Sequence, residues 1–125
     1  MTESDIRVSR PNTSTAVVAL IGDHDVTVVE LFRAVTERAL ADTRHLILDV
    51  SETTFIDTMM LNAVVKLEQR CRKDGVRFQV AVGDISNTWR VLEITGLTGM
   101  FDCVPSVAQA LASLSSAPIV ESGPS

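Results

Sequence analysis

The sequence predicts an α/β domain built on a mostly parallel sheet with an antiparallel edge. Strand and helix patterns alternate along most of the chain, which is typical of parallel strands joined by right-handed helical crossovers. The first two apolar runs are instead separated by a short, turn-rich stretch, which predicts an antiparallel pair. A chain of 125 residues has the length of a single domain. We expect a mixed sheet of about five strands with about four helices.

Five segments have the character of strands. Alternating or β-branched runs occupy residues 5–9, 15–21, 46–50, 78–82 and 100–104. The first two are joined across R-P-N-T-S at 10–14, a stretch rich in turn residues. The run L-I-L-D-V at 46–50 has too few polar residues for a half-exposed strand. We therefore expect it in a central position in the sheet.

The first two expected helices each begin at a recognisable cap. Thr27 and Glu30 have the spacing of a capping box, and apolar residues at helical spacing then continue over about 28–41. The second helix covers about 58–73, with Asp57 as the expected N-cap residue. Its apolar stripe has the i, i+4, i+7 spacing of one buried helix face.

The second half of the chain repeats the scheme. The second helix is expected to end before Gly75, Ser86 caps a third helix, and Ser106 opens a fourth with an S-x-x-Q capping box. We expect the domain to cover residues 1–116. Residues 117–125 are rich in Pro, Gly and Ser without periodicity, and we expect a disordered tail there.

Composition excludes several function classes. The formal net charge is −5 and Lys and Arg are not clustered, so we expect no nucleic-acid partner. No apolar run approaches the length of a membrane span, and the start M-T-E-S-D-I-R-V is not a leader, so we expect a cytoplasmic protein without a membrane partner. His24 and His45 have no further ligands at metal spacing, so neither a metal nor a cofactor is expected. Nucleophile elbows and phosphate-binding loops are absent from the sequence, which argues against an enzyme.

Three stretches together resemble a known family. They are I-G-D-H-D before the first helix, L-I-L-D-V-S-E-T-T-F-I-D-T before the second, and I-T-G-L-T-G-M-F-D around the last strand. In this order and spacing they resemble the STAS domain, and the single-domain anti-sigma-factor antagonists of bacteria in particular. The resemblance implies a single STAS-like α/β domain and a role in regulating transcription by partner switching. The partner it implies is an anti-sigma factor, usually a serine kinase of the GHKL type, whose capture releases a sigma factor.

The resemblance also implies a binding site. In the family, the loop after the third strand and the following helix contact the partner, and an acidic pair follows the second strand. Carried onto this sequence, the partner-binding residues are Asp23, Asp25, Asp57, Thr58 and Met59. A solvated turn explains the first two acids almost as well, and an N-cap role explains Asp57, so both interpretations stay open.

The sequence departs from the family at the phosphorylation motif Asp-Ser-Ser-Gly. Asp57 matches its Asp and Thr58 its first Ser, whereas Met59 occupies the position of the usual phosphoacceptor. Thr58 is a possible phosphorylation site, although one residue on a helix is a rotation of about 100°. Met60 falls on the apolar stripe and is expected in the core, and Met59 lies off it.

Two further questions stay open in the sequence. Cys71 and Cys103 form a possible redox pair that could replace phosphate as a switch, although free thiols are the default in a reducing cytosol, and buried, unrelated thiols are the better interpretation. The alternative function is a STAS subunit in a transporter-associated or stress-signalling assembly. Self-association into a weak homodimer is also left open.

Overall fold

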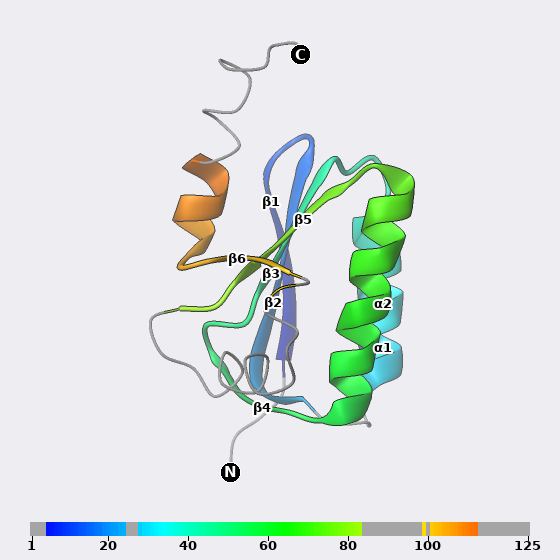
Figure 1. The fold of residues 1–125 in the computed structure, drawn as a ribbon, viewed down its shortest axis with the longest axis vertical. Helices are drawn as coiled ribbons and strands as arrows, with labels where there is room; N and C mark the ends of the chain where they lie inside the picture. The colour runs from blue at the N-terminus through cyan, green and yellow to red at the C-terminus, as the bar shows by residue number, and fades with distance from the viewer. Residues whose placement is uncertain (1–4, 25–27, 84–98, 100, 113–125) are drawn as a thin grey trace.

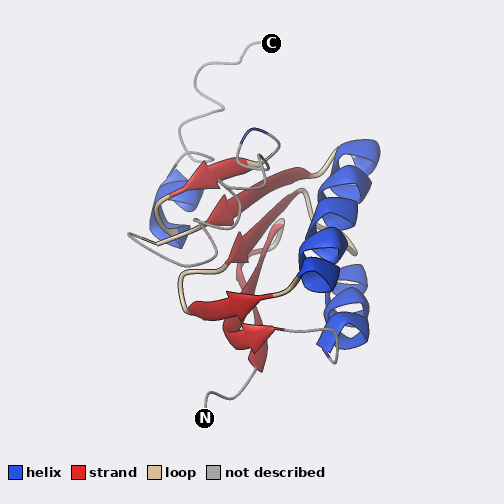
Figure 2. Cartoon of the chain, turned by 60° about the horizontal axis from the view of Figure 1, so that its bottom comes forward, coloured by secondary structure: helices blue, strands red, loops and turns tan. Residues whose placement is uncertain are grey.

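A computed structural model of the chain describes residues 5–24, 28–83, 99 and 101–112. A six-stranded sheet forms its centre, with the two long helices α1 and α2 side by side on one face (Figure 1). A short helical segment at residues 107–112 covers the other face, so the molecule has three layers (Figure 2). This arrangement confirms the predicted α/β class.

The sheet is mixed, as expected, with one antiparallel edge. The elements in chain order are β1 (Asp5–Asn12), β2 (Thr15–His24), α1 (Val29–Ala39), β3 (His45–Asp49), β4 (Thr53–Ile56), α2 (Thr58–Asp74), β5 (Arg77–Ala81) and β6 (Asp102–Val104). The strands lie in the order β1-β2-β3-β5-β6, and β4 pairs with β2 beside this path. Only the pairing of β1 with β2 is antiparallel among the described strands.

The central strand β3 is buried on both faces. Leu46, Ile47 and Leu48 are each at most 1% exposed. Leu46 and Leu48 belong to the larger core beneath α1 and α2, and Ile47 packs in a smaller core with Ala110 of the 107–112 segment. Burial on both faces explains why this run contains almost no polar residue.

The first strand is longer than the pattern predicts. We expected a strand over 5–9, but β1 continues to Asn12 and the turn is tightened to residues 13–14. The register with β2 shifts between Ser9 and Asn12, a segment that includes Pro11. Proline is tolerated there because an edge strand has one side that donates no hydrogen bond to a neighbour.

The limits of the first helix are also corrected. It covers Val29–Ala39 instead of about 28–41, and its N-cap residue is Val28, which makes no side-chain capping bond. The predicted N-cap residue is therefore corrected from Thr27 to Val28, and Glu30 lies 3.6 Å from Arg33 in an ion pair. Thr27 lies outside the described residues.

The end of α1 is set by a tertiary contact. The carbonyl oxygen of Ala39 accepts hydrogen bonds from the Arg10 guanidinium of β1 at 3.1 Å and from the Thr43 hydroxyl. These donors satisfy a carbonyl that the ended helix would leave unpaired. A donor from a distant strand therefore takes part in ending this helix, which no local pattern could reveal.

The later elements match expectation more closely. The second helix ends before Gly75, whose φ of 73° is the left-handed conformation that glycine adopts readily. At the fourth helix the Ser106 hydroxyl accepts a hydrogen bond from the Gln109 amide at 3.1 Å, which confirms that half of the capping box. The third helix, expected from Ser86, and the tail at 117–125 lie outside the described residues.

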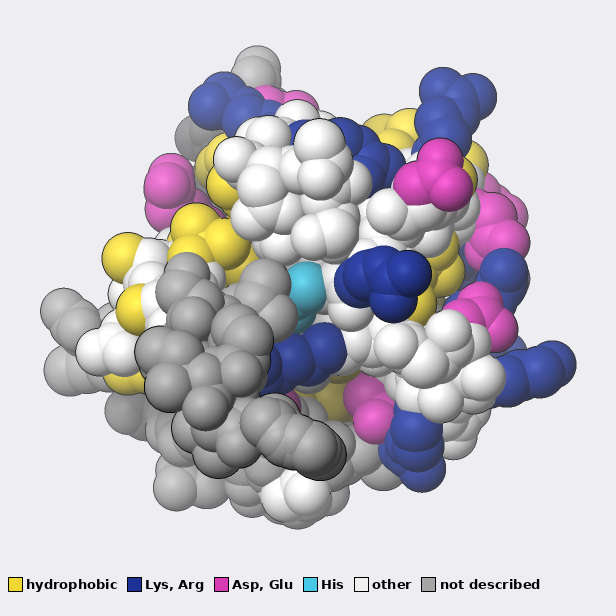
Figure 3. All heavy atoms as spheres, turned by 90° about the horizontal axis from the view of Figure 1, so that it is seen from above, with side chains coloured by type: hydrophobic (Ala, Val, Ile, Leu, Met, Phe, Trp, Pro, Cys, Tyr) yellow, Lys and Arg dark blue, Asp and Glu magenta, His cyan; other side chains and the backbone are white. Residues whose placement is uncertain are grey.

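Acidic and basic side chains are intermixed at the end of the molecule where α1 and α2 finish (Figure 3). There Arg70 of α2 donates to Glu37 of α1 at 3.0 Å and to Asp74 at 2.7 Å.

Neither helix is long and apolar enough to cross a membrane, and the same holds for the other described helical residues. The absence of a nucleic-acid partner stays a prediction.

Candidate protein-binding site

The short strand β4 determines where the candidate site lies. We expected no strand between residues 50 and 58, but Thr53–Ile56 pairs in parallel with the last residues of β2. Two threonines, an aromatic residue and an isoleucine in a row were the signal that was missed. The pairing sets Asp23 opposite Phe55, two residues before Asp57. Asp23 and Asp57 thus lie near the same edge of the sheet, and Asp25 lies outside the described residues.

The loop between β3 and β4 is built by the D-V-S motif. The carboxylate of Asp49 accepts from the Ser51 amide at 3.0 Å and from the Ser51 hydroxyl at 2.7 Å. The hydroxyl of Thr53 then donates to the Leu20 carbonyl at 2.7 Å and ties the loop to β2. The motif therefore shapes the turn that leads to β4, which is a structural role.

A close approach at Gly83 supports this loop from the other side. Gly83 has a φ of 78°, and a Cβ built on it would lie 3.0 Å from the Cβ of Ser51. The Gly83 amide donates to the Pro105 carbonyl at 3.0 Å, and the Val50 amide donates to the Ala81 carbonyl at 2.9 Å. The loop is thus held between the ends of β2 and β5.

Asp57 caps α2, as predicted. Its backbone is extended, with φ −92° and ψ 176°, and its carboxylate accepts from the Met60 amide at 2.9 Å. A capping carboxylate pairs with an exposed N–H group and lies at the positive end of the helix dipole. The side chain is half-buried, so Asp57 can cap the helix and still face a partner.

The two methionines at the start of α2 face opposite environments. Met60 is fully buried in the core beneath the helices, whereas Met59 is 51% exposed beside an exposed Thr58. The helical pattern predicted both placements. Met59 therefore places a large apolar side chain in solvent on the first turn of α2, and a flexible, polarisable thioether suits a contact surface.

The cysteines do not belong to this site. Both are free thiols, and Cys71 lies more than three helical turns beyond Thr58. Burial raises the pKa of the Cys71 thiol to about 12, with smaller contributions from the charges of Glu68 and Asp74. Burial also raises the pKa of the half-buried Cys103. A high pKa leaves little thiolate to react, so the redox pair stays a prediction that these surroundings disfavour.

Metal binding has no support in the described part of the chain. No group of three His, Cys, Asp or Glu side chains in residues 5–24, 28–83, 99 and 101–112 is arranged to hold an ion. What the start of α2 presents is therefore a capped helix terminus, an exposed hydroxyl and an exposed thioether. Such a set can form a contact with another protein.

A family comparison decides which domain this is. The model of the STAS domain matches residues 7–110. The chain belongs to the STAS domain family. The match covers the sheet, both long helices and most of the 107–112 segment, so the expected resemblance is confirmed. No curated protein sequence matches the chain significantly.

Solved structures resemble this STAS domain over most of its length. An anti-sigma factor antagonist from Mycobacterium paratuberculosis has a TM-score of 0.78 and 20% identity, covering 89% of this chain and 93% of its own. The Bacillus cell fate determinant SpoIIAA in its phosphorylated form has a TM-score of 0.68 and 19% identity, and the match covers 88% of this chain and 99% of SpoIIAA. A sulfate transporter family protein from Wolinella succinogenes has a TM-score of 0.72 and 16% identity, and the match covers 84% of this chain and 88% of that protein's chain. At such identities the likeness shows the fold alone.

Proposed function

We propose that this STAS domain is an anti-sigma-factor antagonist that binds an anti-sigma factor and thereby releases a sigma factor in the cytoplasm. The observation that carries the proposal is the exposed Met59 on the first turn of α2, next to the half-buried cap Asp57. The likeness in fold to the anti-sigma factor antagonist from Mycobacterium paratuberculosis, and to SpoIIAA, whose unphosphorylated form is also described as an anti-sigma factor antagonist, supports it. The protein would act by binding and not by catalysis.

The proposed contact surface combines an apolar centre with polar neighbours. Met59 would be buried against the partner, and the removal of its apolar surface from water would favour binding. Thr58 beside it offers a hydroxyl, and Asp57 and the backbone position of Asp23 lie near the same edge of the sheet. A partner that fits would present an apolar pocket flanked by basic side chains, because complementary charge speeds and orients association. The family resemblance suggests a serine kinase of the GHKL type.

Regulation by phosphate would differ from the usual family switch. A phosphate carries nearly two negative charges, which a partner packed over the start of α2 would have to desolvate or repel. Met59 has no hydroxyl to accept one. Thr58 has, and it is exposed, but it points in another direction around the helix than the position of the usual acceptor. We propose that partner release does not depend on phosphate at the usual position.

A second candidate function is a STAS subunit of a larger assembly, such as a transporter-associated complex. The likeness to a sulfate transporter family protein, at a TM-score of 0.72, favours this candidate. The two functions differ in the partner they require. A kinase-fold protein that co-purifies with the chain supports the first, and components of a membrane complex support the second.

The decisive experiment measures partner binding to variants at the start of α2. The protein captured by the full chain is identified by mass spectrometry, purified and titrated by calorimetry. Met59→Glu and Asp57→Lys should each weaken binding roughly tenfold or more, which corresponds to about 1.4 kcal/mol. Gln69→Glu is the matched control, because it adds the same charge at an exposed position near the other end of α2. Equal affinity of Met59→Glu and the control would show that this surface is not the interface.

A further inference from the structure

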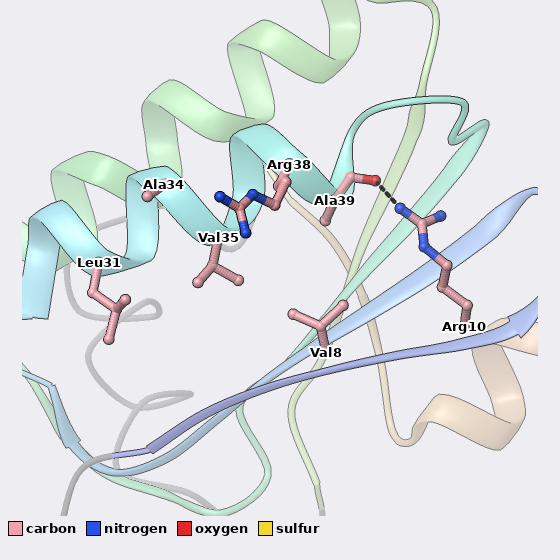
Figure 4. Close-up of a pocket in the computed structure, with 7 residues that line it drawn as sticks. All are labelled: Val8, Arg10, Leu31, Ala34, Val35, Arg38 and Ala39. Carbon is pink, nitrogen blue, oxygen red and sulfur yellow. Dashed lines mark hydrogen bonds between the residues drawn. The ribbon is translucent and has the colours of Figure 1, made fainter.

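A second surface lies away from the start of α2, between the edge strand β1 and helix α1. It is a groove of about 430 Å³ whose apolar lining comes from Val8, Leu31, Ala34, Val35 and Ala39 (Figure 4). Val8 is 45% and Leu31 is 53% exposed. With Met59, these two are the large apolar side chains that the described residues leave exposed. Two of the three therefore gather in one groove.

The strand that forms one wall of the groove has a free edge. In the described part of the chain, β1 pairs only with β2 and stands at the end of the strand order. Its regular part at residues 6–9 is in register with β2, whereas the shift and Pro11 interrupt the ladder further on. A free edge presents unpaired N–H and C=O groups that can pair with an additional strand. Four residues extend over roughly 14 Å.

The groove is basic at one end. Arg10 and Arg38 line it at the end where α1 finishes, and Leu31 lies toward the other end (Figure 4). Arg10 closes the groove by donating to the Ala39 carbonyl and, at 3.1 Å, to the Thr43 hydroxyl. Among the described residues, Arg38 has neither an ion pair nor a side-chain hydrogen bond. None of the described residues that line the groove is acidic, although the whole chain has a net charge of −5.

We propose that this groove binds an extended, acidic segment of a partner protein, which adds as a strand to the free edge of β1. Alternate side chains of the segment would pack on Leu31, Val35 and Val8, and an acidic group at one end would pair with Arg38. Main-chain pairing supplies affinity in such β-augmentation, and pockets for alternate side chains supply specificity. A charge-assisted pair between a carboxylate and a guanidinium adds direction, because only one end of the groove is basic.

This second surface is separate from the one proposed for the anti-sigma factor. It consists of the free edge and one face of β1 together with the exposed flank of α1, whereas the proposed function uses the first turn of α2. A STAS domain with both surfaces could hold two protein partners at once. The inference does not depend on the identity of the first partner, so the two proposals can fail separately.

The test uses the full chain and labelled synthetic peptides. The probes are two octapeptides in which valine alternates with threonine and two glutamates stand at either the first or the last positions, so that both strand directions are sampled. At least one should bind with a micromolar dissociation constant in fluorescence anisotropy, and amide shifts in NMR spectra should occur in β1 and α1. The same peptide with lysine in place of glutamate, or with alternate amides N-methylated, should bind about tenfold more weakly or worse.

Two variants of the protein make the test specific. Arg38→Glu should weaken binding of the acidic peptide about tenfold or more. Lys73→Glu is the matched control, because it also reverses a positive charge in the last turn of a helix, but in α2. The proposal is wrong if neither acidic peptide binds, if Arg38→Glu binds as well as Lys73→Glu, or if the shifts occur at the start of α2. It is also wrong if sedimentation shows a dimer of this chain and the amide shifts that accompany its dissociation place β1 at the dimer interface.

Discussion

The imidazole Nε2 of His45 lies 2.6 Å from the side-chain oxygen of Gln79, and both residues are only 1% exposed. The Gln79 amide nitrogen donates in turn to Asp102 at 3.1 Å, so the oxygen of Gln79 is left to accept from a protonated Nε2. The neutral imidazole then carries its proton on Nε2. Its Nδ1 is buried without a hydrogen-bond partner among the described residues. A second proton there would be a charge in the interior without an acceptor.

The first prediction concerns the pH dependence of stability. Burial lowers the pKa of His45 below its ordinary value of 6.5, and the Arg77 charge lowers it further, while the hydrogen bond that His45 donates to Gln79 and the charge of Asp102 raise it. Above that ordinary value His45 is neutral whether folded or unfolded. As the pH falls below 6.5, His45 takes up a proton in the unfolded chain before it does so in the folded protein. The free energy of unfolding therefore decreases by at most about 1.4 kcal/mol per pH unit until the pH reaches the lowered pKa of the folded protein.

Urea unfolding from about pH 7 to about pH 5 measures this effect. His45→Gln removes the titrating group, so the free energy of unfolding of this variant should vary less steeply with pH than that of the unchanged protein. The comparison is between slopes, because the substitution also changes the stability itself. Parallel curves for the two proteins would show that His45 does not take part in the pH response.

The second prediction separates the two methionines at the start of α2. Met60→Glu buries a carboxylate in the core, so we expect a loss of about 3–5 kcal/mol or failure to fold. Met59→Glu should change the free energy of unfolding by no more than about 0.5 kcal/mol, since the side chain is exposed and the helix dipole favours an acid there. Urea titrations followed by circular dichroism report both values. Similar losses for the two variants would contradict the assigned faces of the helix.

The third prediction concerns phosphorylation. If the partner has a kinase fold, incubation with the partner and ATP should leave this chain unmodified or poorly modified, because Met59 has no hydroxyl to accept phosphate. Intact-mass spectrometry measures the result. Complete addition of one phosphate that is abolished by Thr58→Val would contradict the prediction and restore the usual switch at Thr58.

The fourth prediction concerns the thiols. With its pKa raised to about 12, Cys71 should resist iodoacetamide in the folded protein at about pH 8, and Cys103 should react slowly. Both should react fully in denaturant. Peptide mapping after mild peroxide should find the two residues unlinked. A Cys71–Cys103 bridge that alters partner affinity would instead support the redox switch.

The fifth prediction compares two glycines in the left-handed conformation. Gly75→Ala meets no atom within 4 Å and should cost about 1 kcal/mol, from backbone strain alone. Gly83→Ala has the same strain and also brings a Cβ to 3.0 Å from Ser51, so it should cost about 2–4 kcal/mol. In a Ser51→Gly background the cost of Gly83→Ala should fall toward that of Gly75→Ala. An unchanged cost would show that the contact with the Ser51 side chain is not responsible.

Local and periodic features of this chain could be predicted from its sequence. The Asp57 cap joins two residues that are three positions apart in the chain, and the opposite placement of Met59 and Met60 follows from the helical period. The central position of the 46–50 run follows from its lack of polar residues, because a strand covered on both faces can hold few. These features depend on neighbours in the chain, so the residue order contains them. The family resemblance rests on the same stretches.

Tertiary structure alone decided the features that depend on distant partners. Four residues at 53–56 form a strand because the end of β2 lies beside them, and α1 ends where Arg10 of β1 reaches its last carbonyl. The His45–Gln79 bond joins residues brought side by side by the pairing of β3 with β5. The basic groove likewise exists only because β1 and α1 are adjacent in space. Each depends on strand register and helix packing, which arise when the whole chain buries its apolar surface together.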